Sequence, residues 1–188
     1  MKNDRKQIIL QTLAKLLETR NPSKITTALL AKESKITEAA LYRHFPSKRT
    51  IFLELFNFCD QTIRSKASEL KKSDLQPLEK AKNLFFFLIM FVEKNKGFAR
   101  ILSREALGPA EKNVIDAVNQ FFKSLELTTK QLLGGEKKLV APPGFSAQFI
   151  VTNAEGIISR FIRSEFKDAP SSYLENQWNM MLRTMSKG

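Results

Sequence analysis

The stretch that decides the fold is residues 25–48, which read ITTALLAKESKITEAALYRHFPSK. It predicts two short helices, 27–34 and 38–44, joined by only three residues, Lys35-Ile36-Thr37. A turn of this length between two short helices is typical of a helix-turn-helix unit. In such a unit the second helix presents its first residues to base edges in the major groove, while nearby hydroxyls, amides and cations bind phosphates. The stretch therefore predicts a DNA-binding module.

The residues around the turn indicate how this module is built. Thr27, Thr37 and Ser47 stand where helices are expected to begin, and a hydroxyl there can cap the first backbone N–H groups. The helix before the pair would brace it, and its apolar residues Ile9, Leu13, Leu16 and Leu17 share one face. We assign to the core of the module Ile8, Leu13, Leu29, Ile36, Leu41 and Phe45.

Outside this stretch the chain shows helical spacing of apolar residues and no strand-like alternation. We therefore predict an all-α protein. The expected helices are 4–20, 27–34, 38–44, 48–72, 77–94, 97–107, 110–133, 145–167 and 171–185. Breaks are expected at the Pro and Gly positions, among them Asn21-Pro22 and Gly108-Pro109, and residues 134–144 should form the one long loop.

The charge of the chain points to a polyanionic partner. Its 31 Lys and Arg residues against 19 Asp and Glu residues leave a formal charge of +12. Residues 1–48 hold 10 basic and 4 acidic residues, and residues 49–188 hold 21 and 15, so each part carries a net +6. Because the first quarter carries half of the excess, it is the better candidate for binding a polyanion, although scattered surface lysines would give the same sum.

Several function classes are disfavoured by composition. One cysteine, Cys59, and one histidine, His44, cannot build an intramolecular disulfide or a Cys/His zinc cluster, and we expect no metal and no cofactor. A Gly-rich phosphate loop and a nucleophile motif are absent, so we expect no enzyme. The longest apolar run, residues 84–92, is about half of a membrane-spanning helix, and the first residues do not resemble a signal peptide. A cytoplasmic protein is expected.

Residues 25–48 resemble the DNA-binding domain of the TetR family. The resemblance rests on Ile25-Thr26, Ala31, Leu41-Tyr42 and the run His44-Phe45-Pro46-Ser47-Lys48. One departure is Lys35, which stands where the family usually has a glycine at positive φ. The resemblance implies a TetR-like architecture, with an N-terminal three-helix helix-turn-helix domain at 1–48 and a C-terminal helical dimerisation and partner or effector domain at 49–188.

Candidate DNA contacts follow from the module and from the family motif. Thr37, Glu38 and Ala39 begin the second helix and should approach base edges. Thr26, Tyr42, His44 and Lys48 should contact phosphate, His44 because of its position in the family motif. Thr27 is a further candidate DNA contact. For Tyr42 the alternative is a ring buried between helices with its hydroxyl at the surface. Lys48 begins a helix whose N-terminal amides can bind the same phosphate.

The last two helices carry apolar faces that a homodimer would bury. A two-fold four-helix interface is the economical way to cover them. The residues assigned to this interface are Phe149, Ile157, Phe161, Trp178 and Met181. A second aromatic stripe, residues 85–91, would line a small-molecule pocket or, more commonly for such stripes, form plain core.

A narrower resemblance is to the nucleoid occlusion factors of the TetR family. It adds Arg100-Ile101-Leu102, Ala106-Leu107, the segment 159–167 and Trp178 to the N-terminal motif. It implies a nucleoid-associated homodimer, with one dimer or a pair of dimers on each DNA site. Such a protein antagonises assembly of the cell-division protein FtsZ over the chromosome.

The positions that match the FtsZ-binding groove of those factors are Phe58, Lys66, Phe87, Met90, Lys94 and Asn95. Lysines replace arginines at 66 and 94, and Phe87 and Met90 replace a leucine and a glycine, so charge is kept while shape is not. A basic groove suits the acidic tail of FtsZ, although an exposed Phe58 is also explained as ordinary surface apolarity.

Two other functions stay open at the level of sequence. A ligand-responsive repressor would share the fold and the DNA module, but it would enclose an open apolar cavity within residues 77–167. A nucleoid occlusion factor would instead have a filled interior and an exposed groove. A purely structural interaction protein is the third possibility, and failure to bind DNA would favour it.

Overall fold

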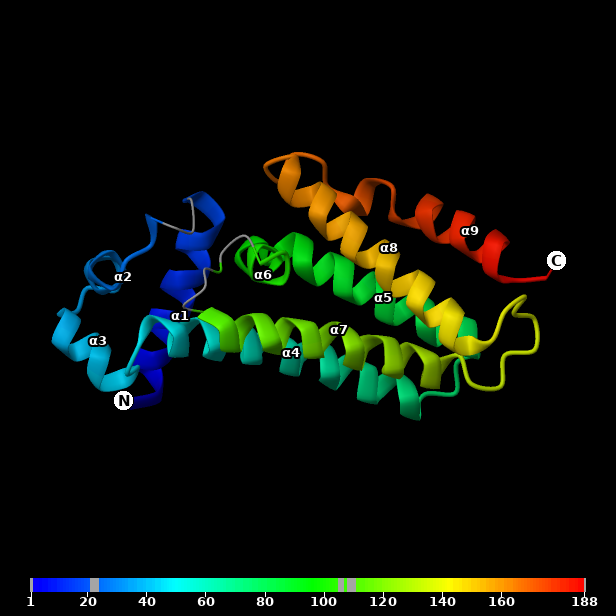
Figure 1. Cartoon of the computed structure of the whole chain (residues 1–188), viewed down its shortest axis with the longest axis horizontal. Helices are drawn as coiled ribbons and strands as arrows, with labels where there is room; N and C mark the ends of the chain where they lie inside the picture. Colours follow the sequence, from blue (N-terminus) through cyan, green and yellow to red (C-terminus); the bar gives the residue numbers. More distant parts are fainter. Residues whose placement is uncertain (1, 21–23, 105–106, 108–110, 188) are drawn as a thin grey trace. The chain divides into compact units, whose positions relative to one another are not determined.

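The computed structural model describes residues 2–20, 24–104, 107 and 111–187. Within these ranges the chain is helical, with one isolated β-bridge between Leu139 and Ser186, which confirms the all-α prediction. The helices are α1 (Lys2–Thr19), α2 (Thr27–Glu33), α3 (Glu38–His44), α4 (Lys48–Lys72), α5 (Pro77–Lys94), α6 (Lys96–Leu102), α7 (Lys112–Leu132), α8 (Pro143–Arg163), the 3-10 helix η3 (Pro170–Ser172) and α9 (Leu174–Met185) (Figure 1).

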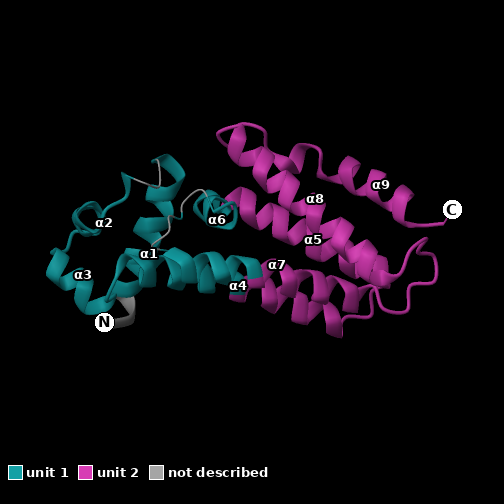
Figure 2. Cartoon of the chain, in the orientation of Figure 1, with its two compact units in different colours: residues 1–60, 95–119 teal, residues 61–94, 120–188 magenta. Residues whose placement is uncertain are grey.

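The chain divides into two compact units (Figure 2). Unit 1 comprises Met1–Asp60 and Asn95–Asn119, and unit 2 comprises Gln61–Lys94 and Gln120–Gly188. Unit 1 therefore holds α1, α2, α3 and α6 with the first part of α4. Unit 2 holds α5, α8 and α9, and the long helices α4 and α7 contribute to both units.

The core of unit 1 forms where the apolar face of α1 meets its neighbours. Ile9, Leu13, Leu16 and Leu17 are all buried, as predicted from their spacing. The assignment of Ile8 to this core is wrong, because its side chain is 37% exposed. Adjacent residues of a helix point about 100° apart, so burying Ile9 turns Ile8 toward solvent.

Two helices end earlier than their sequences suggest, and left-handed residues end them. The helix expected to reach residue 107 stops at Leu102, and Arg104 follows with a φ of 66°. The helix expected to reach residue 167 stops at Arg163, where Glu165 and Phe166 have φ values of 54° and 64°. Non-glycine residues seldom adopt this conformation, so composition did not mark these ends. Residues 105, 106 and 110 and the breaks at Asn21-Pro22 and Gly108-Pro109 lie outside the described residues.

Unit 2 is packed around aromatic side chains. The ring of Trp178 on α9 lies 5.8 Å from that of Phe85 and 6.5 Å from that of Phe86, both on α5. A crevice among α5, α7 and α8, lined by residues such as Leu88 and Leu125, has a volume of only about 10 Å³. Phe85 is therefore plain core, as the commoner interpretation of the aromatic stripe predicted. None of the described helices is both long enough and apolar enough to cross a membrane.

Candidate nucleic-acid interface and neighbouring surfaces

The first helix of the predicted module begins one residue earlier than expected. The N-cap of α2 is Thr26, whose Oγ1 accepts a hydrogen bond from the backbone N–H of Leu29 at 3.1 Å. Assigning the cap to Thr27 was therefore wrong. Thr27 is the first helical residue, and its hydroxyl donates to Glu38 Oε1 at 2.7 Å.

The turn between α2 and α3 is closed by backbone hydrogen bonds around Lys35. The N–H of Ile36 donates to the carbonyl of Ala31, and the N–H of Lys35 donates to that of Lys32, both at 3.0 Å. This pair of bonds is a Schellman motif, in which the residue after the cap adopts the left-handed conformation. Lys35 does so with a φ of 56°, which is the conformation that the family resemblance implies for this position. The turn therefore forms without a glycine.

The second helix presents a polar N-terminus at the surface. Thr37 caps it by accepting from the N–H of Ala40 at 3.1 Å, and Glu38 and Ala39 are exposed on its first turn. The hydroxyl of Tyr42 donates to Thr27 Oγ1 at 3.3 Å, and the hydroxyl of Thr27 donates to Glu38, so the three side chains form a chain of hydrogen bonds. Tyr42 is 47% exposed, so its ring is not buried between the helices.

Two basic side chains lie near the end of α3 and the beginning of α4. His44 is the last residue of α3 and is half-buried. Lys48 begins α4, where Ser47 accepts from the N–H of Thr50 at 3.2 Å and thus acts as the predicted cap. The ammonium of Lys48 lies 5.4 Å from the centre of the Phe52 ring, which holds the stem of the side chain against the helix.

All eight candidate DNA contacts therefore belong to one segment of unit 1, from the cap of α2 to the start of α4 (Figure 1). The structure adds two exposed cations that the sequence analysis did not select. Arg43 lies on α3 beside Tyr42, and Arg49 lies in the first turn of α4. In the sequence, the only indication that Arg43 and Arg49 could bind DNA was that they stand next to residues of the motif. Whether a charged side chain lies on the DNA-facing surface cannot be predicted from that residue alone.

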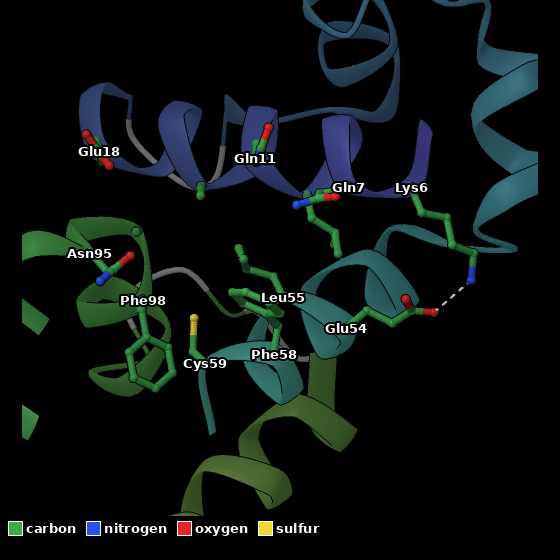
Figure 3. Close-up of a pocket in the computed structure, with 13 residues that line it drawn as sticks. Lys6, Gln7, Gln11, Glu18, Glu54, Leu55, Phe58, Cys59, Asn95 and Phe98 are labelled. Carbon is green, nitrogen blue, oxygen red and sulfur yellow. Dashed lines mark hydrogen bonds and ion pairs between the residues drawn. The ribbon is translucent and has the colours of Figure 1, made fainter. Parts of the chain in front are cut away.

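Unit 1 also contains a pocket of about 530 Å³ between α1, the first part of α4 and the start of α6 (Figure 3). Two of the predicted partner residues line it: Phe58, which is 63% exposed, and Asn95. At one edge Lys6 Nζ and Glu54 Oε1 form an ion pair at 3.3 Å (Figure 3). Cys59 lies on the wall, and burial raises the pKa of its thiol from 9.0 to about 12. The structure thus brings Phe58 and Asn95 to one pocket.

The other predicted partner residues belong to unit 2. Phe87, Met90 and Lys94 follow one another at helical spacing on the outer side of α5. Phe87 stacks on Phe91 with ring centres 6.1 Å apart, while Met90 and Lys94 are exposed. Lys66 on α4 forms an ion pair with Glu69 at 2.7 Å. An apolar strip that ends in a cation therefore lies along α5.

The side chains chosen for a dimer interface are mostly covered by their own chain. Phe161 packs on Phe166 with ring centres 5.0 Å apart, and Trp178 packs on α5. Phe161, Trp178 and Met181 are each 2% exposed or less, so the argument that a second copy is needed to bury them is wrong. Ile157 is also buried, and Phe149 is the one member of the set that stays exposed.

The fold and the helix-turn-helix define a bacterial regulator of the TetR class. The family described as "Bacterial regulatory proteins, tetR family" matches residues 9–55. The family described as "Tetracyclin repressor-like, C-terminal domain" matches residues 75–186. The chain belongs to the TetR family, and it is a DNA-binding protein and not an enzyme.

Within this family the chain is similar to nucleoid occlusion factors. It is 38% identical over 183 residues to the nucleoid occlusion factor SlmA of Shewanella woodyi, covering 94% of this chain and 92% of that protein. It is 37% identical over 186 residues to SlmA of Shewanella pealeana, with 96% and 94% covered.

Solved structures show the same fold at lower identity. NalD, the secondary repressor of the MexAB-OprM multidrug efflux pump in Pseudomonas aeruginosa, has a TM-score of 0.79 at 18% identity and covers 100% of this chain and 99% of its own. FadR from Bacillus subtilis in complex with stearoyl-CoA has a TM-score of 0.75 at 14% identity, with 93% and 96% covered.

Proposed function

We propose that this protein is a nucleoid occlusion factor, which binds DNA as a homodimer and antagonises FtsZ ring assembly over the chromosome. The observation that carries the proposal is the contrast within unit 2. The crevice among α5, α7 and α8 holds about 10 Å³, too little for an organic effector, whereas α5 carries Met90 and Lys94 exposed on its surface. The similarity to SlmA over nearly the whole chain supports the same function.

The DNA side of the proposal assigns two kinds of contact. Thr26, His44 and Lys48 bind phosphates, which position the module, and Thr37 and Ala39 approach base edges. Both capping threonines use their oxygens as acceptors, so each hydroxyl proton can be donated to a phosphate or a base.

Glu38 has a particular role in this arrangement. One of its carboxylate oxygens accepts from Thr27, which in turn accepts from Tyr42, so the side chain is oriented before DNA binds. The other oxygen can accept from the N4 amino group of cytosine, which is the usual base partner of a carboxylate in the major groove. Tyr42 keeps enough exposure for its hydroxyl to reach a phosphate as well.

The partner side of the proposal assigns an acidic peptide with apolar residues, such as the tail of FtsZ. In unit 1, Phe58 and Asn95 offer an apolar ring and an amide at one pocket. In unit 2, Phe87 and Met90 offer apolar contact, and Lys94 offers an exposed cation. Lys66 is paired with Glu69 at the surface, and such pairs hold weakly, so an incoming carboxylate can replace Glu69.

The experiment that tests this function measures FtsZ assembly by light scattering in the presence of protein and its operator DNA. The double variant Lys66→Glu, Lys94→Glu should lose inhibition and keep DNA affinity nearly intact, since both lysines lie outside the helix-turn-helix. The matched control changes two exposed lysines of α7, Lys123→Glu and Lys130→Glu, with the same change in charge. Equal inhibition by both double variants would contradict the partner surface.

Chromosome-wide mapping of binding sites separates this function from promoter repression. Sites scattered over much of the chromosome but absent from the terminus support nucleoid occlusion. Sites at one or a few promoters support a ligand-responsive repressor, for which the pocket of about 530 Å³ in unit 1 is the specific observation. Its size lies within the range of sites for small organic molecules. If the protein shows no effect on FtsZ with operator DNA present, the repressor takes the place of the proposed function.

A further inference from the structure

A hollow of about 270 Å³ lies between α8 and the first residues of α9 in unit 2. Figure 1 shows these two helices running beside each other. Its polar rim is held by internal contacts. Gln177 on α9 donates to Asn153 Oδ1 on α8 at 3.2 Å, and the guanidinium of Arg160 lies 5.1 Å from the centre of the Tyr173 ring. The other residues that line the hollow are Thr152, Gly156 and Ile157. Because the polar side chains of the rim contact one another, the hollow is already formed in the single chain, with Gly156 in its lining.

Among the residues that the structure describes, no neighbour requires a glycine at position 156. It lies in the interior of α8, where glycine is the least favourable residue apart from proline. A Cβ atom built at this position would meet nothing within 4 Å, and its φ is not in the left-handed region. Gly97, by contrast, is required by the backbone of Ala14, which a Cβ would approach to 2.6 Å. The backbone at position 156 is therefore open to close approach by a side chain from outside the chain.

The same face of α8 carries exposed aromatic side chains. Phe149 is 38% exposed, and Phe145, one turn earlier, is 67% exposed. Phe149 and Gly156 are seven positions apart, a spacing that places both on one side of the helix. On α9, Met180 is 67% exposed. The stripe thus contains a protruding ring and a hollow with room for a ring.

We propose that two copies of the chain interlock along α8, with Phe149 of each copy inserted into the hollow over Gly156 of the other. In a two-fold interface a contact from position i to position j occurs twice, so one ring and one hollow per copy satisfy each other. The two α8 helices then cross in opposite directions midway between positions 149 and 156, beside Thr152 and Asn153. Phe145 and Met180 lie around this crossing. The inference rests on the homodimer of the proposed function and specifies its register.

Cysteine cross-linking tests the register. In the double variant Phe149→Cys, Gly156→Cys the two new thiols of one copy lie about 10 Å apart along the helix axis, beyond the reach of a disulfide. A disulfide between them can therefore form only between copies. Mild oxidation should convert the double variant into covalent dimer on a non-reducing gel. Each single-cysteine variant should run mostly as a monomer on the same gel, because it forms no covalent cross-link. The single variants also show whether the buried native Cys59 forms a disulfide with a new cysteine.

Substitution of the glycine gives a second readout, by sedimentation velocity at several protein concentrations. Gly156→Leu should fold, because its Cβ meets nothing within 4 Å, the rest of the side chain extends into the hollow, and leucine favours a helix. It should raise the dimer dissociation constant by about tenfold to a hundredfold. Exchanging ring and hollow, in Phe149→Ala with Gly156→Phe, should recover part of this loss. Leu127→Ala, which removes an exposed apolar side chain of α7, is the control and should leave the dimer unchanged.

The outcomes separate this inference from the proposed function. A wild-type dimer that forms no cross-link in the double cysteine variant, or that tolerates Gly156→Leu, overturns the register while the homodimer stands. A wild-type protein that sediments as a monomer in the presence and absence of DNA overturns the homodimer itself. Cross-linking that needs both cysteines supports the proposal.

Discussion

Replacing Gly97 by alanine should destabilise unit 1, because the start of α6 packs directly on the backbone of α1. A Cβ at position 97 would lie 2.6 Å from the carbonyl oxygen of Ala14, and 3.2 Å from both Ala14 Cα and Leu17 Cβ. The first contact is shorter than side-chain carbons tolerate, and its partner is a backbone atom that cannot rotate away. The two helices must therefore move apart.

The size of the effect follows from two opposing terms. An additional methyl group in a packed site costs about 1–3 kcal/mol. Alanine in place of glycine in a helix returns at most about 1 kcal/mol. Because the 2.6 Å neighbour is a backbone atom, the cost lies in the upper part of this range, about 2–3 kcal/mol. The free energy of unfolding should therefore fall by about 1–2 kcal/mol, which lowers the ratio of folded to unfolded protein by about 5- to 30-fold.

Urea unfolding followed by far-UV circular dichroism measures this loss, with all variants at one protein concentration because the dimer contributes to stability. Amide hydrogen exchange should show the loss of protection in α1 and α6. Gly144→Ala is the matched control, since Gly144 is also the second residue of its helix and its nearest neighbour is the flexible Lys130 side chain at 3.9 Å. A Gly97→Ala protein as stable as wild type would refute the close packing of α1 and α6.

Further predictions concern single residues. Lys48→Ala should weaken binding to all DNA sequences alike and reduce the slope of log affinity against log salt by about 1, as measured by fluorescence anisotropy; an unaltered slope would remove the phosphate contact. Glu38→Ala should change base preference in a selection from random DNA, with little change in the salt slope, and unchanged preference would contradict its role in the groove. Lys35→Gly should raise the free energy of unfolding by up to about 1 kcal/mol, because its φ of 56° suits glycine, and a lower urea midpoint would show that Lys35 makes compensating contacts. Burial raises the pKa of Cys59 from 9.0 to about 12, so its contribution to stability is complete below pH 9 and is lost as pH rises toward 12. Stability curves of wild type and Cys59→Ala should therefore converge or cross in that window, and parallel curves would contradict the shift.

The sequence by itself determined the helical class and the DNA-binding module. The sequence pattern predicted a helix at each of α1 to α9, although not the separate 3-10 helix η3, and the hydroxyls at positions 37 and 47 were correctly identified as caps. These features depend on residues within one or two turns of each other, so a linear pattern contains them. The cap of α2 was missed by one position because Thr26 and Thr27 are chemically equivalent, and only the backbone conformation distinguishes them.

Only the tertiary structure decided which apolar face of each helix is covered by its own chain. On α8 and α9 the pattern contains two apolar stripes, and the sequence analysis chose Phe161 and Trp178 for the surface between copies. Phe166 and α5 cover these two, and Phe149, two turns before Gly156 on α8, is left exposed. Periodicity states which residues share a face, but burial depends on which distant segment packs against that face, and that information is not local in the chain.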